Sequence, residues 1–342
     1  MQLPPIVKSA VYTTAHVTGL SRALALRYRG CGVIFALHSV VADDAFHPDH
    51  TLRCPVSTLD WVLGRLRRQN LDIVTLDEVV ERLNAPAPKP FAAFTFDDGF
   101  ADNLTLALPV MEKYAAPFTV YVPTGMIARD IDAWWFGVAA WIGRRDRIEL
   151  PGLGRFVCAD TAGKQRTFAS IESAIHQNFD LLPAVRDALG SDGIEIGPLV
   201  DREALTERQL RTLAQHPLVT IGGHTTTHLN LARAPAATAT TEMANNRKFL
   251  QDLTGQPVWH NAYPFGHAGA CGEREADISR AVGFRTAVTT RPGAIFPQHR
   301  DHLHALPRIC VTHDENASTL HCKLNGFPRA VNSRLGDPVA RM

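Results

Sequence analysis

The chain has 342 residues, of which 45% are hydrophobic and 20% charged, so it can bury a large core and does not belong with disordered proteins. Its 35 basic and 34 acidic side chains nearly balance, which excludes a general attraction to nucleic acid or to an anionic membrane. Six cysteines are scattered without a CxxC pair, and we expect them to be reduced thiols.

The first 30 residues contain the first predicted element. Four apolar residues recur there at helical spacing, with arginines nearby: Val17, Leu20, Leu24 and Tyr28. The pattern predicts an N-terminal helix packed on the domain. A peripheral helix on a membrane surface, near a lipid-linked substrate, is the less favoured interpretation. No apolar run is long enough for a transmembrane segment and the start of the chain makes a poor signal peptide, so we expect a cytoplasmic protein.

From residue 31 onward, short apolar runs alternate with helical patterns. The strand candidates are GVIFALHSV, LDIVTL, FAAFTFDD, FTVYVPTG, LVTIGGHT, VWHNAYPFG, FRTAVTT and HALPRICV. This alternation predicts an α/β fold with a mainly parallel sheet, and the number of repeats favours a closed or nearly closed barrel. We expect one barrel domain over residues 31–342, interrupted by a helical insertion at about 143–202.

Several helix ends can also be predicted. Thr206 and Gln209 form a capping box at the start of one helix. Gly255 and Gly283 follow two further apolar-periodic segments, where a glycine commonly ends a helix.

Two adjacent carboxylates, Asp97 and Asp98, end one apolar run in the stretch TFDDGF. Burial of either carboxylate would cost free energy unless an ion pair or hydrogen bonds compensated it. In parallel α/β folds, reactive groups gather where strands end. Gly99 permits a sharp turn through which both carboxylates can face one pocket. Alone, a DDG triplet is more often a turn than a site.

Two histidines follow another strand candidate in IGGHTTTHLN. His224 and His228 are four residues apart and would share a face on a helical turn. Two imidazoles and one carboxylate form a three-ligand site for a divalent cation, with positions left for water and substrate. Such a cation would neutralise one aspartate of the pair and leave the other free to take a proton. An isolated HxxxH pair is weak evidence for a metal site. The aspartate pair and the histidine pair support each other, because each follows a predicted strand of the same barrel.

The motifs TFDDG, HTTTH and AYPFG, in this order, resemble those of the polysaccharide deacetylases, carbohydrate esterase family 4 with the NodB homology domain. The resemblance covers about residues 90–311, and FALHSV is a weaker match upstream. It implies a distorted (β/α) barrel and a metal-dependent hydrolase that removes acetyl groups, chiefly N-acetyl, from a sugar or glycan precursor. The reaction class would be a carbohydrate deacetylase acting on carbon–nitrogen bonds other than peptide bonds.

The resemblance also implies roles for single residues. Asp97 would be the general base, with metal-bound water as the nucleophile. Asp98, His224 and His228 would bind one divalent ion, zinc being expected and cobalt or nickel the alternatives. The backbone N–H of Phe265 would stabilise the oxyanion. The substrate would be an acetylated sugar, a nucleotide sugar or a lipid-linked glycan.

The sequence departs from the family pattern in two places. Ala262 stands where the family has an arginine that braces the base, and we take Arg308, at the end of the last strand candidate, as a hypothetical replacement. The family's LxH histidine, the general acid, has no clear counterpart either. Four histidines lie near strand ends, and we favour the first of them as the pocket residue: His38, His302, His304 and His313.

Trp134 and Trp135 follow the YVPTG strand end. Stacking on a sugar ring and packing of the insertion explain them equally well.

Two other functions were weighed against the hydrolase. Non-haem iron oxygenases also use two histidines and one carboxylate, but the alternating α/β pattern and the spare base fit hydrolysis better. The main alternative is a catalytically inactive barrel that binds glycans or acts as a scaffold in polysaccharide biosynthesis. The missing arginine and the uncertain acid favour that alternative.

Overall fold

One parallel sheet positions the candidate site. The computed structural model describes residues 5–342, with side chains from residue 9 onward. The eight-stranded sheet has the order β11-β10-β9-β6-β5-β1-β12, and β4 pairs with β5 outside this path. Its strands are β1 (Gly32–Leu37), β4 (Asp72–Ile73), β5 (Phe91–Phe96), β6 (Phe118–Val122), β9 (Val219–Gly223), β10 (His260–Ala262), β11 (Thr286–Val288) and β12 (Ile309–Cys310).

The two ends of this sheet approach each other. Leu306, just before β12, forms a parallel bridge with Val288 of β11. Backbone hydrogen bonds join Leu306 to Ala287 and Thr289 as well. Because β12 pairs with β1 on its other side, the sheet curls into a nearly closed α/β barrel, and the predicted fold class is confirmed.

The register of β1 and β5 determines what meets at the edge of the sheet. The paired residues run in parallel from Gly32 with Phe91 to Leu37 with Phe96. Both strands therefore end at the same level, and the next residue of each chain segment, His38 and Asp97, leaves the sheet at the same carboxyl edge.

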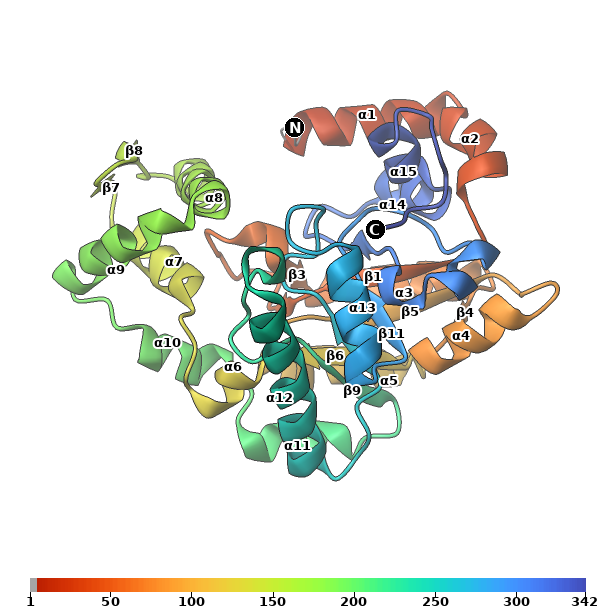
Figure 1. The fold of residues 1–342 in the computed structure, drawn as a ribbon. Coiled ribbons are helices and arrows are strands. Elements are labelled where there is room, and N and C mark those ends of the chain that lie inside the picture. Colours follow the sequence, from red (N-terminus) through yellow and green to blue (C-terminus); the bar gives the residue numbers. More distant parts are fainter. Residues whose placement is uncertain (1–4) are drawn as a thin grey trace.

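Helices cover the outside of the barrel (Figure 1). The barrel helices are α3 (Val56–Arg68), α4 (Leu76–Asn84), α5 (Leu108–Lys113), α6 (Thr124–Ala128), α11 (Glu207–Ala214), α12 (Ala236–Thr254) and α13 (Glu273–Val282). The predicted capping box of Thr206 and Gln209 begins α11. Gly255 and Gly283 end α12 and α13 with positive φ. After β1, the chain forms a small second sheet in which β2 (Ser39–Val41) pairs with β3 (Arg53–Pro55).

The insertion folds around a core of its own, to one side of the barrel (Figure 1). It contains α7 (Trp134–Arg144), β7 (Arg147–Leu150), β8 (Gly154–Val157), α8 (Thr161–Gln177), α9 (Leu182–Ser191) and α10 (Ile196–Glu203). Two features differ from the prediction. The insertion begins before residue 143, and it includes the antiparallel hairpin β7–β8. Gly152 and Gly154 have φ of 82° and 91° in the hairpin turn, a conformation that glycine adopts without steric cost.

Two helices, and not one, precede the barrel: α1 (Pro5–Val17) and α2 (Leu20–Tyr28). The helix breaks at Gly19, whose φ is 76°. These helices pack with α14 (Ala317–Leu324) and α15 (Phe327–Asn332), and we call these four helices with the tail to residue 342 the terminal helix group. The rings of Tyr12 and Phe327 meet in its small core, with centroids 5.5 Å apart. The two helices pack on the C-terminal helices, and the break divides the predicted apolar stripe and leaves Val17 and Leu20 exposed.

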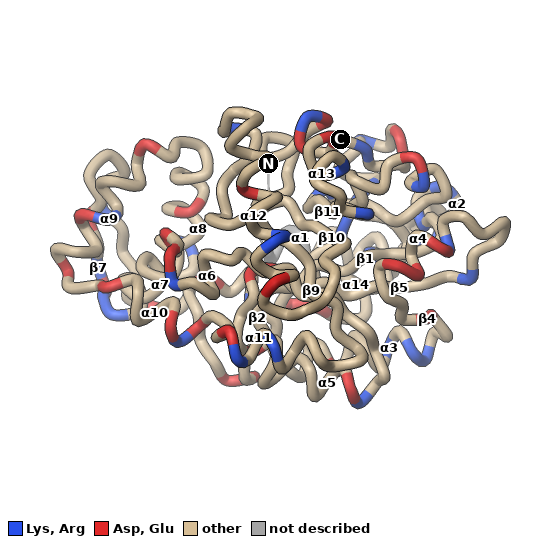
Figure 2. The backbone as a smooth tube through the Cα atoms, turned by 60° about the horizontal axis from the view of Figure 1, so that its bottom comes forward, with Lys and Arg blue, Asp and Glu red and all other residues tan. Residues whose placement is uncertain are grey.

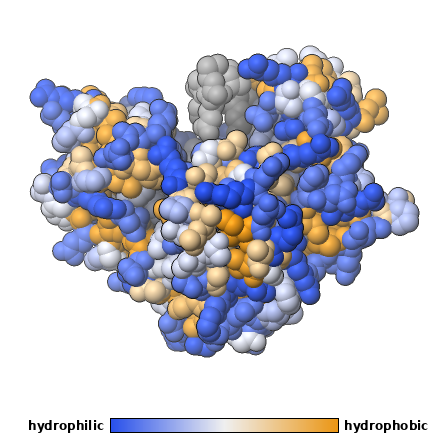
Figure 3. Space-filling view, in the orientation of Figure 1, coloured by the Kyte–Doolittle hydropathy of each residue, from blue (hydrophilic) through white to orange (hydrophobic). Residues whose placement is uncertain are grey.

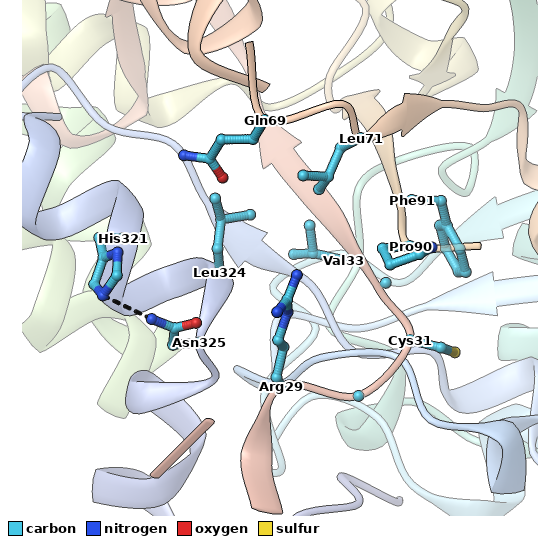
Figure 4. A pocket seen from close by; sticks show the side chains of 12 residues that line it. Arg29, Cys31, Val33, Gln69, Leu71, Pro90, Phe91, His321, Leu324 and Asn325 are labelled. Atoms are coloured by element: carbon cyan, nitrogen blue, oxygen red, sulfur yellow. Dashed lines mark hydrogen bonds between the residues drawn. The ribbon is translucent and has the colours of Figure 1, made fainter. Parts of the chain in front are cut away.

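A cavity of about 280 Å³ lies where the terminal helix group meets the barrel (Figure 4). Gly32 and Phe91 line it at the amino ends of β1 and β5, and Arg29 points into it from the end of α2. Asn325 donates a hydrogen bond of 2.8 Å to His321 on its wall. The cavity is at the opposite end of the strands from the paired aspartates and is separate from the candidate site.

Two findings concern the chain as a whole. All six cysteines are free thiols. Within residues 5–342, no helix combines the length and the apolar character needed to cross a membrane.

Candidate active site and metal centre

The paired aspartates leave β5 in a sharp turn. The N–H of Asp97 still donates to the carbonyl of Leu37, extending the ladder with β1 by one bond of 2.9 Å. Asp98 and Gly99 then both have positive φ, 72° and 64°. A left-handed aspartate is uncommon, and its cost is offset by the contacts described below. The turn brings both buried carboxylates to one place, where His38 influences the pKa of each.

Arg308 forms a bidentate ion pair with Asp97. Its two terminal nitrogens lie 2.7 Å from the two carboxylate oxygens, and both side chains are buried. The same guanidinium donates to the carbonyl of Thr289 and to the hydroxyl of Thr95, each at 3.0 Å. Burial alone would raise the pKa of Asp97, but the charge and hydrogen bonds of Arg308 outweigh it and lower that pKa. The structure thus places a guanidinium beside Asp97 although Ala262 lacks one.

Asp98 faces the two histidines of the HTTTH motif. Its Oδ1 lies 3.4 Å from Nε2 of His224 and 3.4 Å from Nε2 of His228. The three ligand atoms all lie within 4.8 Å of one another. These are a carboxylate and two imidazoles, a donor set suited to zinc and similar divalent ions.

The hydrogen bonds around this triad fit a bound cation. Among the described residues, the buried Oδ1 of Asp98 has no hydrogen-bond partner. Nδ1 of His224 lies 2.7 Å from the carbonyl oxygen of Ala262, which places a proton on Nδ1 and directs Nε2 towards Asp98. Burial lowers the pKa of His228 to about 4, so its ring is neutral, as a metal ligand must be. The residues present therefore fit a divalent metal.

The loop that carries the two histidines is not the helical turn that the sequence suggested. Thr225 and His228 have φ of 62° and 56°, so the chain passes twice through the left-handed region and His228 is turned back towards Asp98. The HxxxH spacing brings both rings to one point through this tight loop and not through a shared helix face.

Two side chains of α12, which the sequence analysis missed, hold this loop. Glu242 accepts hydrogen bonds from the backbone N–H groups of Thr226 and Thr227, each at 2.9 Å. Asn246 accepts from the N–H of His224 and donates to the carbonyl of Val122. Both positions lie on an otherwise ordinary helix, and their distance from the motif in sequence hides the role.

Phe265 lies in the AYPFG loop beside the triad. Its φ is 62°, and the next residue, Gly266, also has a positive φ. Its backbone N–H makes no hydrogen bond to another described residue, while its carbonyl accepts from the hydroxyl of Thr290 at 2.7 Å. The ring lies against His228, with centroids 4.9 Å apart. The loop beside His228 therefore holds a backbone N–H that no described residue uses.

His38 is the one candidate acid that the structure brings to the aspartates. Its Nε2 lies 3.8 Å from Oδ2 of Asp97, and its side chain is 17% exposed. Burial lowers the pKa of His38, partly opposed by the charge of Asp97, so the ring is neutral. Asn103 donates to the carbonyl of His38, and Asp102 accepts from the hydroxyl of Ser39, which fixes the backbone on both sides.

The other candidate histidines have different surroundings. His304 is buried, and its Nε2 bonds to the carbonyl of Phe284. His302 lies at the edge of the same short helical segment. His313 is exposed and its ring packs against that of His50. None of the three contacts Asp97 or Asp98 through any interaction among the described residues.

Aromatic residues of the insertion line the approach to the metal ligands. The ring of Trp135 lies 5.3 Å from that of His228, between centroids. The ring of His176, on α8, lies 4.9 Å from that of Phe265. Trp134 instead belongs to the buried core of the insertion. The two tryptophans therefore differ: one packs the insertion and the other borders the site.

A third buried carboxylate, Asp49, was also missed. It lies in the β2–β3 connection, 3.8 Å from Arg53, and its Oδ1 has no hydrogen-bond partner in the described part of the chain. Burial raises the pKa of Asp49 to about 7, and Asp98 is among the charges that act on it. Burial, assisted by the charge of Asp49, likewise raises the pKa of Glu172 on α8 to about 7.

The sequence profile described as polysaccharide deacetylase matches residues 84–287. "Putative polysaccharide deacetylase YxkH" of Bacillus subtilis (strain 168) is 32% identical over 109 residues, which are 32% of this chain and 37% of that protein. The matched part is thus little more than a third of that relative's length.

Solved structures with the same fold are more distant in sequence. The Streptococcus pyogenes deacetylase PplD, in complex with acetate, superposes with a TM-score of 0.54 at 18% identity, covering 82% of this chain and 92% of that one. IcaB from Ammonifex degensii gives a TM-score of 0.55 at 16% identity, covering 88% and 98%. A de-N-acetylase from Aggregatibacter actinomycetemcomitans gives 0.56 at 13% identity, covering 85% and 99%. These similarities show the fold, a deacetylase barrel of the NodB type.

The profile match spans more than half of the chain and includes both aspartates, both histidines and the Phe265 loop. The barrel, the register that brings the strand ends together and the matched motifs agree with one another. The chain belongs to the polysaccharide deacetylase family.

Proposed function

We propose that this protein is a metal-dependent hydrolase that removes N-acetyl groups from a sugar or glycan precursor. One observation carries the proposal: an ionised carboxylate, Asp97, is held by Arg308 directly beside the triad of Asp98, His224 and His228. A binding protein gains nothing from an ionised base next to a metal site, whereas hydrolysis needs both.

The divided roles of the two aspartates follow from their partners. A divalent ion held by Asp98, His224 and His228 would polarise the acetyl carbonyl and make water a stronger acid. Zinc is the expected ion, with cobalt or nickel as alternatives. Asp97 pairs with Arg308 and is not one of the proposed metal ligands. It therefore remains able to accept a proton from the attacking water.

Two further groups serve the tetrahedral intermediate. The free N–H of Phe265 donates to the oxyanion, and one such donor is worth about 3–4 kcal/mol in enzymes where it has been removed. His38, whose Nε2 lies 3.8 Å from Asp97, takes up the proton that Asp97 accepts from the attacking water and passes it to the leaving nitrogen. A positioned acid of this kind contributes about 10²–10⁴-fold.

The substrate is an acetylated sugar, which could be free, bound to a nucleotide or linked to a lipid. Trp135 and the rings of His176 and Phe265 give the mouth of the site the partly aromatic lining on which a sugar ring can stack. The reaction is hydrolysis of a carbon–nitrogen bond other than a peptide bond.

Both arguments for the scaffold alternative are weakened. It was favoured by the missing family arginine, but Arg308 now occupies the position of a brace on Asp97. It was also favoured by the uncertain acid, and His38 lies within reach of the same carboxylate.

The first experiment is to measure the metal content of protein purified without a metal-binding tag, beside Asp98→Ala and His228→Ala. We expect one divalent ion per chain, lost in both variants. His216→Ala is the matched control, because that histidine pairs with Glu112 far from the triad. The metal-loaded protein is then tested for acetate release from acetylated sugars, which Asp97→Asn should abolish without releasing the metal.

Absence of bound metal, even after incubation with zinc, cobalt or nickel salts, would contradict the proposed hydrolase. Metal binding without acetate release from any acetylated sugar would instead favour the catalytically inactive scaffold.

A further inference from the structure

The exposed large apolar side chains are concentrated in one part of the molecule. In the described chain there are seven of them, and five belong to the terminal helix group: Val17, Leu20, Leu26, Val331 and Leu335. Leu26 is 96% exposed and Val17 is 76% exposed. Hydrophobic residues are visible at the outer surface above α1 and α2 (Figure 3). Scattered exposed apolar residues are ordinary, but this concentration marks an interaction surface.

The same part of the chain carries a local excess of positive charge. Residues 1–42 contain four basic and no acidic residues, and residues 316–342 contain four basic residues and one acidic residue. These residues have seven more basic than acidic side chains, although Lys323 is buried in an ion pair with Glu315. The whole protein has one more basic than acidic side chain, so the remaining residues have a net charge of minus six. Over the barrel and the insertion, acidic and basic residues are interspersed (Figure 2).

Three arginines of this group are not neutralised by carboxylates, whereas Arg341 lies 4.0 Å from Asp337. Arg22, Arg29 and Arg334 are exposed, and none forms an ion pair with a described residue. Arg27 uses its guanidinium to bond the carbonyl of Gly336, tying α2 to the C-terminal tail. The two ends of the chain are thereby tied together, and this part of the molecule carries both the exposed aliphatic side chains and the unpaired arginines.

We propose that the terminal helix group docks on an anionic lipid surface. Aliphatic residues that enter the boundary of the acyl chains, surrounded by arginines that meet anionic headgroups, are the two requirements of peripheral membrane binding. A second copy of this chain is a poorer occupant, because pairing two such surfaces would bring two large positive charges together. Nucleic acid is also a poorer binding partner, because it would not bury the exposed leucine and valine side chains in an apolar environment.

The position of this surface is compatible with an open active site. α2 leads through Gly30 into the amino end of β1, whereas the paired aspartates lie at the carboxyl end of β5. Docking through the terminal helix group therefore leaves the mouth of the metal site uncovered.

The test is co-sedimentation of the full-length protein with phosphatidylcholine vesicles, with and without phosphatidylglycerol. We expect binding that requires phosphatidylglycerol and weakens with added salt. Leu26→Ser and Val17→Ser should each lower the partition coefficient, together by about tenfold or more. Arg22→Gln should lower it about fivefold.

Control substitutions elsewhere on the molecule distinguish binding through the terminal helix group from non-specific binding to vesicles. Val157→Ser removes a valine that is 68% exposed on β8 of the insertion. Arg208→Gln removes an exposed arginine of α11. Neither control should change binding, and all variants should keep the circular dichroism spectrum of the parent.

Three results would overturn the proposal: no binding to either vesicle, binding that does not depend on phosphatidylglycerol, or equal losses in the controls. Light scattering gives a fourth. If the parent were a dimer and Leu26→Ser a monomer, the surface would belong to a second copy of the chain.

Discussion

The barrel and the insertion contribute to the site in different ways. The barrel supplies Asp97, Asp98 and Arg308, which are fixed by backbone bonds and a buried bidentate pair. The insertion has a separate core and reaches the site through side-chain rings alone, such as Trp135 against His228. Groups that take part in chemistry need fixed geometry, whereas a rim that selects substrates tolerates more freedom. We therefore expect barrel substitutions to remove activity or stability, and insertion substitutions to change substrate preference.

The largest effect is expected for Arg308→Met. It leaves Asp97 buried without its partner, and breaking a buried ion pair in this way costs about 3–5 kcal/mol. Chemical unfolding should show this loss in the free energy of unfolding, together with reduced acetate release. Arg308→Lys should recover only part of both, because a lysine cannot make the bidentate contact. Unchanged activity in Arg308→Met would remove Arg308 from the proposed site.

The next effect concerns the loop that holds the histidines. Glu242→Gln replaces a carboxylate that accepts from two backbone N–H groups, so the loop loses charge-assisted bonds but keeps its shape. Supporting residues of this kind typically change metal affinity by about 10–100-fold. Competition with a chelator measures the affinity. Glu207→Gln, at the exposed start of α11, is the control and should have no effect.

A pH-dependent effect tests whether the two regions are coupled. Burial raises the pKa of Asp49 to about 7, above its unfolded value, so the folded protein holds a proton that the unfolded chain has lost. The folded state therefore loses stability as pH rises from about 4 to about 7. Asp49→Asn should remove this loss and stabilise the protein by about 1–2 kcal/mol at pH 8 relative to pH 5.

The measurement is chemical unfolding at both pH values. A variant that shifts stability equally at both would show that Asp49 keeps one charge state throughout. Glu172→Gln on α8 then asks whether the insertion shares this titration, since the charge of Asp49 contributes to the raised pKa of Glu172.

The smallest effect is expected for Trp135→Ala. Loss of one stacking ring at the mouth should raise KM severalfold, about 1 kcal/mol, and leave kcat nearly unchanged. Trp134→Ala, in the insertion core, should instead lower the melting temperature. A large fall in kcat for Trp135→Ala would mean that the insertion takes part in the chemistry after all.

Much of this site can be predicted from the sequence because it lies at strand ends. The apolar runs before Asp97 and before His224 are strands of one parallel sheet, and parallel strands bring their carboxyl ends to one edge. The absence of a charge at Ala262 was also enough to direct attention to Arg308. His38 could be inferred because its strand pairs with that of Asp97.

Other parts could not be predicted, for physical reasons. Left-handed φ at Asp98 and His228 is stabilised by tertiary contacts, and residue type alone does not single out these two positions among the other aspartates and histidines. Glu242 supports the histidine loop from a helix whose pattern reports only its buried face. The net charge of the whole chain suggested no affinity for anionic membranes, because a sum over all residues hides an uneven distribution.

Asp97 and Arg308 are 211 residues apart in the sequence, so the ribosome synthesises the base long before its ion-pair partner. The family profile ends at residue 287, before the strand that carries the arginine. A chain that has emerged from the ribosome only to that point already holds the aspartates and both histidines, yet its base has no counter-charge and its barrel has no closing strand. Closure of the barrel and pairing of Asp97 therefore depend on the last segment of the chain to be synthesised.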